Sequence, residues 1–307
     1  MRTLGIAICL VSIGWISPFS VHAEFQVGAA VVDITPDQLP VLVNGGMLSR
    51  SADAVKTRVN ARAIVLDDGV ERIGIVVVDS CMVPKVLLDD AKYRAAVKTK
   101  IKADRILISA THTHTAPSSF GALGTNADPT YVPFLRQRLV DALVEAEKKL
   151  QPARVGWGVA KADQFTALRR WVRRPDRLGE DPFGNPTVRA NMHAAANPDD
   201  VTGQSGPEDP DLSMIVFQSK NGTPIAALAN FSMHYFSDRA ISADYFGLFC
   251  DGLQKYVRKR HPNSEMVGVM SHGCSGDVWR RDYMTWKSGE DPTIEGYTQG
   301  LLELAKQ

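Results

Sequence analysis

The chain has 307 residues, of which 44% are hydrophobic and 22% charged, and its formal net charge is +1. This is the composition of a globular enzyme with a sizeable core, and the balanced charge excludes the strongly basic surfaces that bind nucleic acids or anionic membranes. Of the four cysteines, Cys9 lies in a predicted leader. The other three allow at most one disulfide, which excludes a disulfide scaffold.

The first 23 residues have the pattern of a secretory signal peptide. Arg2 gives a short positive start, residues 4–16 are mostly apolar, and small residues at Val21 and Ala23 favour cleavage after position 23. The apolar run is too short to cross a bilayer, and no other stretch is a candidate for a transmembrane segment. We therefore expect an exported protein, either secreted or periplasmic.

The remainder, residues 24–307, alternates between predicted strands and helices. The expected strands cover residues 27–34, 60–67, 72–78, 105–110, 155–160, 213–218, 225–231 and 266–270. The expected helices cover residues 85–99, 135–150, 246–260 and 292–306. This order predicts a single layered α/β domain, with a mixed sheet because a hairpin at residues 67–69 adds antiparallel pairing. Residues 163–211 resist assignment, and their prolines and glycines and the five arginines at 169, 170, 173, 174 and 177 are typical of a lid or binding loop.

Histidines follow three of the predicted strands. His112 and His114 follow the strand at 105–110, His234 follows 225–231, and His272 follows 266–270. Ligand sites in α/β sheets gather at such strand ends. Residues i and i+2 of an extended segment point to the same side, so His112 and His114 could face one metal ion. A pair of hydrogen-bonded turn histidines is the alternative.

Other polar residues leave several interpretations open. Asp79 and Asp244 could orient a ligand histidine, or could serve as caps and turn formers. Cys274 beside His272 could form a thiol nucleophile and its base, or the cysteine could be buried and inert. The arginines of residues 163–211 could hold an anion or a carbonyl oxygen, or could form a solvated face.

Several segments together resemble one family. Residues 106–117, with the sequence ILISATHTHTAP, closely resemble the SATHTHSGP segment of the neutral/alkaline, non-lysosomal ceramidases. Residues 230–234 and 241–244 are similar to the second histidine strand of that family and the ISxD segment after it. Residues 27–36, 44–46, 61–63 and 209–217 are also similar, so the resemblance covers nearly all of residues 24–307, in order.

The resemblance implies a ceramidase-type N-terminal catalytic domain that uses Zn²⁺ to activate water against an N-acyl amide bond. Carried over by position, the zinc ligands are His112 and His234, and His114 contacts the substrate and stabilises the oxyanion. The expected substrate is ceramide or a related N-acyl lipid.

The sequence departs from the family pattern in two places. The segment 276–281 places Trp279 where the family has a serine, which puts the serine-assisted part of the mechanism in doubt. The family's remaining zinc ligands, a Glu and a Tyr, are expected downstream of Gln307, so we expect the domain to be incomplete at its C-terminus. Two alternatives therefore stay open: a secreted ligand-binding protein with a degenerate site, and a cysteine amidase that uses Cys274 and His272.

Overall fold

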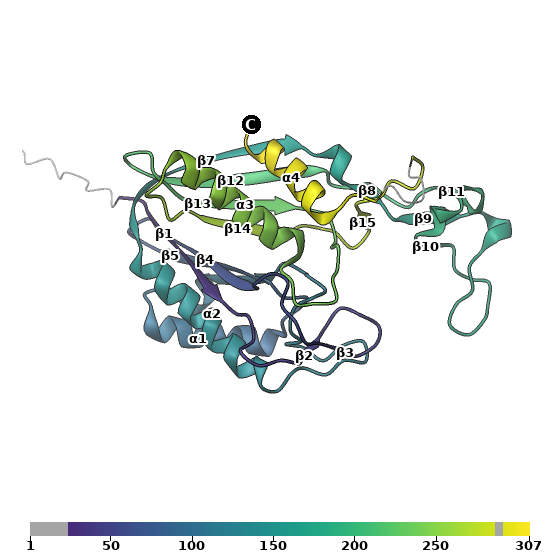
Figure 1. Cartoon of the computed structure of the whole chain (residues 1–307), viewed down its shortest axis with the longest axis horizontal. Coiled ribbons are helices and arrows are strands. Elements are labelled where there is room, and N and C mark those ends of the chain that lie inside the picture. The colour runs from purple at the N-terminus through teal and green to yellow at the C-terminus, as the bar shows by residue number, and fades with distance from the viewer. Residues whose placement is uncertain (1–23, 286–290) are drawn as a thin grey trace, which may run out of the picture.

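The computed structural model describes residues 24–285 and 291–307. The predicted signal peptide lies outside the described residues. The described part is a mixed α/β fold with one large sheet flanked by helices, which confirms the predicted fold class (Figure 1). None of its helices is long and apolar enough to span a membrane.

Eight strands form the main sheet, in the order β14-β13-β12-β7-β1-β4-β5-β6. Their bounds are β1 Gln26–Asp33, β4 Asn60–Asp67, β5 Arg72–Val78, β6 Ile106–Ala110, β7 Gln151–Lys161, β12 Asp211–Ser219, β13 Pro224–Phe231 and β14 Val267–His272. The pairs β5–β6 and β13–β14 are parallel and the other pairs are antiparallel. The sheet is therefore mixed, as the hairpin between β4 and β5 predicts.

The sheet is folded back on itself at the junction of β1 and β7. These two strands pair over only two residues of each, Gln26–Val27 of β1 with Gln151–Pro152 of β7. Beyond this junction the halves β1-β4-β5-β6 and β7-β12-β13-β14 face each other across a shared apolar core. That core contains Ile64 and Val77 from one half and Phe217 and Val269 from the other.

Two pairs of helices cover the outer faces of the halves. Helices α1 (Lys85–Lys98) and α2 (Tyr131–Lys148) pack on the first half, and α3 (Asp244–Arg260) and α4 (Ile294–Ala305) pack on the second. In α2 the buried residues Leu135, Leu139 and Leu143 recur every four positions, so one helical face turns toward the sheet. The result is a four-layer arrangement of helices, sheet, sheet and helices (Figure 1).

The unassigned stretch of the sequence forms an arm that projects from this body (Figure 1). Its three-stranded sheet has the order β10-β9-β11 and packs around the buried side chains of Trp171 and Tyr283. A further two-stranded sheet pairs β8 with β15 and ties the arm to the loop after β14. The bounds are β8 Ala167–Leu168, β9 Arg170–Arg173, β10 Ala190–Met192, β11 Val201–Gln204 and β15 Val278–Trp279. A last hairpin on the body joins β2 (Val41–Val43) to β3 (Arg50–Ala52).

Candidate active site

The folded-back sheet brings four histidines together at one end of the two halves. His112 and His114 follow β6 in the first half, while His234 follows β13 and His272 ends β14 in the second. The ring centroid of His112 lies 4.6 Å from that of His114, 4.8 Å from that of His234 and 5.6 Å from that of His272. The four histidines that follow predicted strands therefore lie together, although the two halves belong to opposite layers; their roles stay a prediction.

His112 and His114 meet through a kink and not through the extended geometry that their spacing suggested. The backbone of Thr111 and His112 still pairs with the end of the neighbouring strand, and His112 then takes a left-handed conformation with φ of 67°. The Nε2 atoms of His112 and His114 lie 3.1 Å apart, with their rings perpendicular. Gly45 allows this packing, because a Cβ there would come within 2.6 Å of the His114 ring.

Backbone carbonyl groups fix the orientation of two of these imidazoles. Nδ1 of His112 lies 2.7 Å from the carbonyl oxygen of Cys81, and Nδ1 of His234 lies 3.1 Å from that of Ser275. A carbonyl oxygen only accepts hydrogen bonds, so both Nδ1 atoms donate and both Nε2 atoms carry a lone pair. That lone pair faces Nε2 of His114 in His112 and Nη2 of Arg169 in His234. Histidine ligands of metals in proteins are commonly held in this way.

Burial favours the neutral form of three of the four imidazoles. Loss of solvent lowers the pKa of His114, His234 and His272 to about 3, neighbouring imidazoles add to the effect, and Arg169 adds to it at His114 and His234. Neutral imidazole is the form that ligates metals. The side-chain Nδ1 atoms of His114 and His272 are buried and have no hydrogen-bond partner.

These residues fit a transition-metal ion. Two nitrogens on one tetrahedral zinc lie about 3.3 Å apart, close to the 3.1 Å between the Nε2 atoms of His112 and His114. Ligand atoms of Cys81, His112 and His114 all lie within 4.8 Å of one another. Among the described residues, this group of close ligand atoms does not include His234, which the resemblance implies as the second ligand. Cys81 was not predicted, although it follows the end of β5 just as the histidines follow their strands. Burial raises the pKa of its thiol to about 12, so in this structure it is a neutral neighbour of His112.

His272 contacts a serine and not the cysteine that the sequence suggested. Its Nε2 lies in hydrogen-bonding contact with Oγ of the buried Ser275, and that Oγ lies 3.2 Å from Nδ1 of His234. Cys274 is exposed, and Cys81 and Cys250 are buried free thiols. The prediction that Cys274 is buried is therefore wrong, and the contacts of the described residues give it no histidine partner; that it is inert stays a prediction. A Ser275 hydroxyl that joins two histidines could not be read from the sequence.

One of the five arginines reaches the histidines. Arg169 is 6% exposed, and its Nη2 lies 3.4 Å from Nε2 of His234. The others stay on the arm: Arg170 pairs with Asp277, and Arg174 with Asp176. Of the five arginines, Arg169 therefore belongs to the site, and the others form a largely solvated face.

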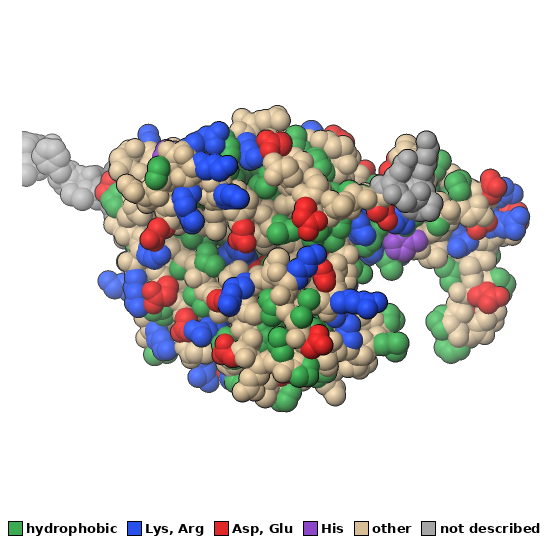
Figure 2. All heavy atoms as spheres, viewed as in Figure 1, with side chains coloured by type: hydrophobic (Ala, Val, Ile, Leu, Met, Phe, Trp, Pro, Cys, Tyr) green, Lys and Arg blue, Asp and Glu red, His purple; other side chains and the backbone are tan. Residues whose placement is uncertain are grey.

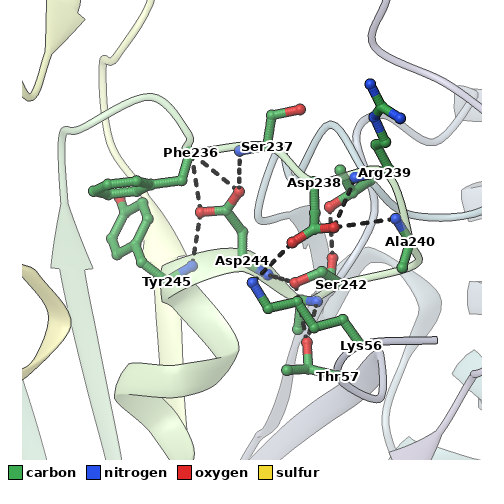
Figure 3. A network of polar contacts seen from close by, with 12 residues as sticks. Lys56, Thr57, Phe236, Ser237, Asp238, Arg239, Ala240, Ser242, Asp244 and Tyr245 are labelled. Atoms are coloured by element: carbon green, nitrogen blue, oxygen red, sulfur yellow. Dashed lines mark hydrogen bonds and ion pairs between the residues drawn. The ribbon is translucent and has the colours of Figure 1, made fainter. Parts of the chain in front are cut away.

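The two candidate orienting aspartates have other roles. Asp79 forms a buried ion pair with Arg62 at 2.6 Å. Asp244, the first residue of α3, accepts hydrogen bonds from the backbone N–H groups of Phe236, Ser237 and Tyr245 (Figure 3). Neither carboxylate contacts a histidine among the contacts of the described residues. Asp244 nevertheless fixes the turn that follows His234.

Aromatic side chains and a cavity both border the histidines. The ring of Tyr235 stacks on His114 with centroids 3.7 Å apart, and Trp279 lies 5.4 Å from Tyr235. A cavity of about 450 Å³ opens beside His112, His234 and His272 and is lined on its other side by apolar residues of α1 and the β5–α1 loop. Two larger cavities of about 530 and 550 Å³ lie away from the histidines and contain none of them.

Known proteins resemble this chain in sequence and in fold. No family model matches it. Neutral ceramidase A of Dictyostelium discoideum is 24% identical over an alignment that covers 89% of this chain and 40% of the relative. The chain is related to the neutral ceramidases. It thus spans about 40% of the length of this curated relative.

Solved ceramidase structures share its fold. The neutral ceramidase from Pseudomonas aeruginosa superimposes with a TM-score of 0.69, at 18% identity, over 92% of this chain and 44% of that one. A structure described as ceramidase complexed with C2 gives 0.71 at 18% identity, over 92% of this chain and 43% of that one. The resemblance that the histidine motif predicted is confirmed. The assignment of residues 24–307 to one incomplete catalytic domain stays a prediction.

Proposed function

We propose that this chain is the histidine-bearing part of a zinc-dependent amide hydrolase that cleaves the N-acyl bond of a ceramide-like lipid. The observation that carries the proposal is the convergence of His112, His114 and His234, with carbonyl-bound Nδ1 atoms that leave the lone pairs of His112 and His234 on Nε2. The sequence relationship to neutral ceramidases supports the reaction and the substrate class. The predicted leader suggests an exported protein.

Each histidine has a distinct part in this proposal. His112 and His234 hold the zinc through Nε2, and the bound metal supplies Lewis acidity and an activated water. His114 is neutral and carries one proton, so it can donate from Nε2 to the oxyanion that develops on the amide. One such donor is worth about 10²–10³ in rate. The stack of Tyr235 on His114 holds the donating ring in place.

Zinc content and turnover of matched variants test the proposal. In the purified exported protein we expect about one zinc per chain, lost in His112→Ala. His114→Ala should keep the metal and lose about 100-fold or more of N-acyl hydrolysis. His261→Ala, an exposed position at the end of α3, should change neither and serves as the control.

Two results would contradict the proposal. Full zinc content in His112→Ala would remove the ligand assignment. Ligand binding without turnover by any N-acyl substrate would favour a secreted binding protein that has lost its chemistry.

A further inference from the structure

One edge of β7 is open over most of its length (Figure 1). Strand β12 pairs with residues 153–161 along one side of β7. On the other side β1 pairs only with Gln151 and Pro152, and the N–H of Ala153 donates to the carbonyl oxygen of Phe25. Beyond Ala153, none of the described residues pairs with this second side. Because Ala153 donates toward β1, the N–H and C=O groups of the odd-numbered residues that follow it point away from β12, into the open edge.

The middle of this edge lacks the features that protect edge strands from pairing with other chains. Charged side chains, prolines and bulges are the usual protection. In β7 they lie toward the ends, with Pro152 and Arg154 near its start and Lys161 at its last position. Residues 155–159 contain no charge and no proline, and their register with β12 is regular, without a bulge. This stretch therefore remains able to pair with a further strand.

Hydrophobic side chains line the open edge. Val155, Trp157 and Val159 alternate along the strand, so they share one face of the sheet, and they are 47%, 81% and 62% exposed. Ile215 of β12 lies opposite Trp157 on the same face and is also exposed. On the face of the molecule shown in Figure 2, by contrast, charged side chains lie between most of the hydrophobic ones. An apolar row beside unpaired backbone groups is a surface to which another strand can be added.

Two glycines lie between these apolar residues without a reason inside this chain. A Cβ at Gly156 or Gly158 would meet nothing within 4 Å, and neither glycine has a positive φ. The strand has no bulge at either position. Glycine inside a strand weakens it, and it often marks a place where another backbone approaches closely. The two glycines therefore point to a neighbour that this chain does not contain.

The sequence of the open edge is symmetric about Trp157. Residues 155–159 read VGWGV in both directions, and Trp157 lies in the middle of the free stretch 154–160. Antiparallel pairing with a second copy about this residue places each tryptophan opposite the other, and each Val155 opposite a Val159. The glycines then also face one another. A two-fold contact between identical subunits needs a self-complementary surface, and this edge provides one.

The same register satisfies the backbone and separates the charges. The outward N–H and C=O groups belong to the odd-numbered residues, so each pair of these residues across the two-fold axis exchanges both N–H···O bonds. Arg154 lies opposite Ala160 of the second copy, and not opposite another cation. Lys161 lies on the other face of the sheet from Arg154 and pairs with Asp211 of its own chain.

We propose that the open edge of β7 pairs with β7 of a second copy of this chain, antiparallel about Trp157, to form a two-fold dimer. The pairing joins the second halves of the two main sheets into one continuous sheet. A tryptophan at the centre of an interface is the kind of residue that contributes most to binding. None of the residues that line the cavity beside the histidines belongs to β7, so each copy keeps its own site open. The inference does not depend on the proposed hydrolase function.

Sedimentation velocity of the purified protein tests the proposal. Between about 1 and 100 μM the parent protein should change from monomer to dimer. Trp157→Ser should raise the dissociation constant about 100-fold or more, because it removes both central rings. Val155→Pro keeps the tryptophan and the pairing with β12 but removes an outward N–H group, so it should also prevent the dimer. Val97→Ser, at a position of α1 that is 87% exposed, is the control and should leave the dissociation constant unchanged.

Cysteine cross-linking tests the register with the tryptophan in place. Val155→Cys and Val159→Cys are each made with Cys274→Ser, which removes the exposed thiol. A mixture of the two variants should form an intermolecular disulfide on mild oxidation, because the paired Cα atoms lie about 5.5 Å apart. Neither variant should cross-link alone.

Three results would overturn the proposal. The first is a parent protein that stays monomeric up to about 100 μM, which would leave the edge to an extended segment of a different protein. The second is a dimer that both Trp157→Ser and Val155→Pro leave intact, since it would use another surface. The third is cross-linking of either cysteine variant alone, which would contradict the two-fold register.

Discussion

Substituting Asp244 by alanine would remove the acceptor for three backbone N–H groups at the turn after His234 (Figure 3). The hydrogen bond from Tyr245 is buried and those from Phe236 and Ser237 are partly buried, and Ser237 is an exposed residue. Water can replace the carboxylate at Ser237 but not at Tyr245. We therefore expect the lost hydrogen bonds to lower the free energy of unfolding by about 2–4 kcal/mol. Asp244 also has a left-handed φ of 56°, where alanine is disfavoured by about 1 kcal/mol more.

The three substitutions alanine, glycine and asparagine separate these contributions. Asp244→Ala should lower the free energy of unfolding by about 3–5 kcal/mol, a large share of a typical total of about 5–15. Asp244→Gly removes the hydrogen bonds without the backbone strain of alanine, so its free energy of unfolding should be about 2–4 kcal/mol below that of the parent protein. Asp244→Asn keeps one acceptor oxygen and tolerates the left-handed backbone, so it should lose about 1 kcal/mol.

Equilibrium unfolding in urea, followed by circular dichroism, measures this order. Zinc affinity should fall along the same series, because the turn that Asp244 holds directly follows His234, a proposed zinc ligand. If the alanine variant is as stable as the asparagine variant, the carboxylate does not hold the turn and the reasoning is refuted.

Three further predictions concern the site and the core. Ser275→Ala removes a hydroxyl that lies 3.2 Å from Nδ1 of His234, a proposed zinc ligand, so zinc affinity should fall about 10-fold. Chelator competition measures this affinity, and an unchanged value would show that the hydroxyl does not help to hold His234. Arg62→Met leaves the buried carboxylate of Asp79 unpaired and should lower the free energy of unfolding, measured in urea, by about 3–5 kcal/mol. The double variant Arg62→Met with Asp79→Leu should recover most of this loss. Equal losses in the two variants would contradict a stabilising role of the ion pair. A thiol reagent at pH 8 should modify the exposed Cys274 and spare Cys81, whose buried thiol has a pKa of about 12, without loss of activity. Inactivation by modification of Cys274 would instead revive the cysteine amidase alternative.

The periodicity of apolar residues predicted the body of the fold well, because its helices and strands are long and each has a buried face that differs in polarity from its exposed face. The strand predicted at 72–78 has those bounds in the structure, and the helix predicted at 135–150 spans Tyr131–Lys148. The arm could not be predicted, since its strands are two to four residues long and too short to show a period. Its partner strand β15 also lies far later in the chain.

The sequence indicated the four histidines of the candidate site, but not Cys81, Ser275 or the way in which the histidines meet. Strand ends indicated His112, His114, His234 and His272, because parallel neighbours in a sheet present their carboxyl ends at one edge. No local pattern indicates that the sheet folds back at β1 and β7, which is what brings the two sets of histidines together. The left-handed backbone at His112 depends on tertiary contacts, so it is also invisible in the sequence.

The short junction between β1 and β7 makes this chain suited to fragment complementation. A cut between residues 150 and 151 would separate two units, each with four strands of the main sheet and its own pair of helices. Only the pairing of Gln26–Val27 with Gln151–Pro152 would be severed within the sheet. One fragment would hold His112 and His114 and the other His234 and His272, so metal binding would report that the halves had reassembled.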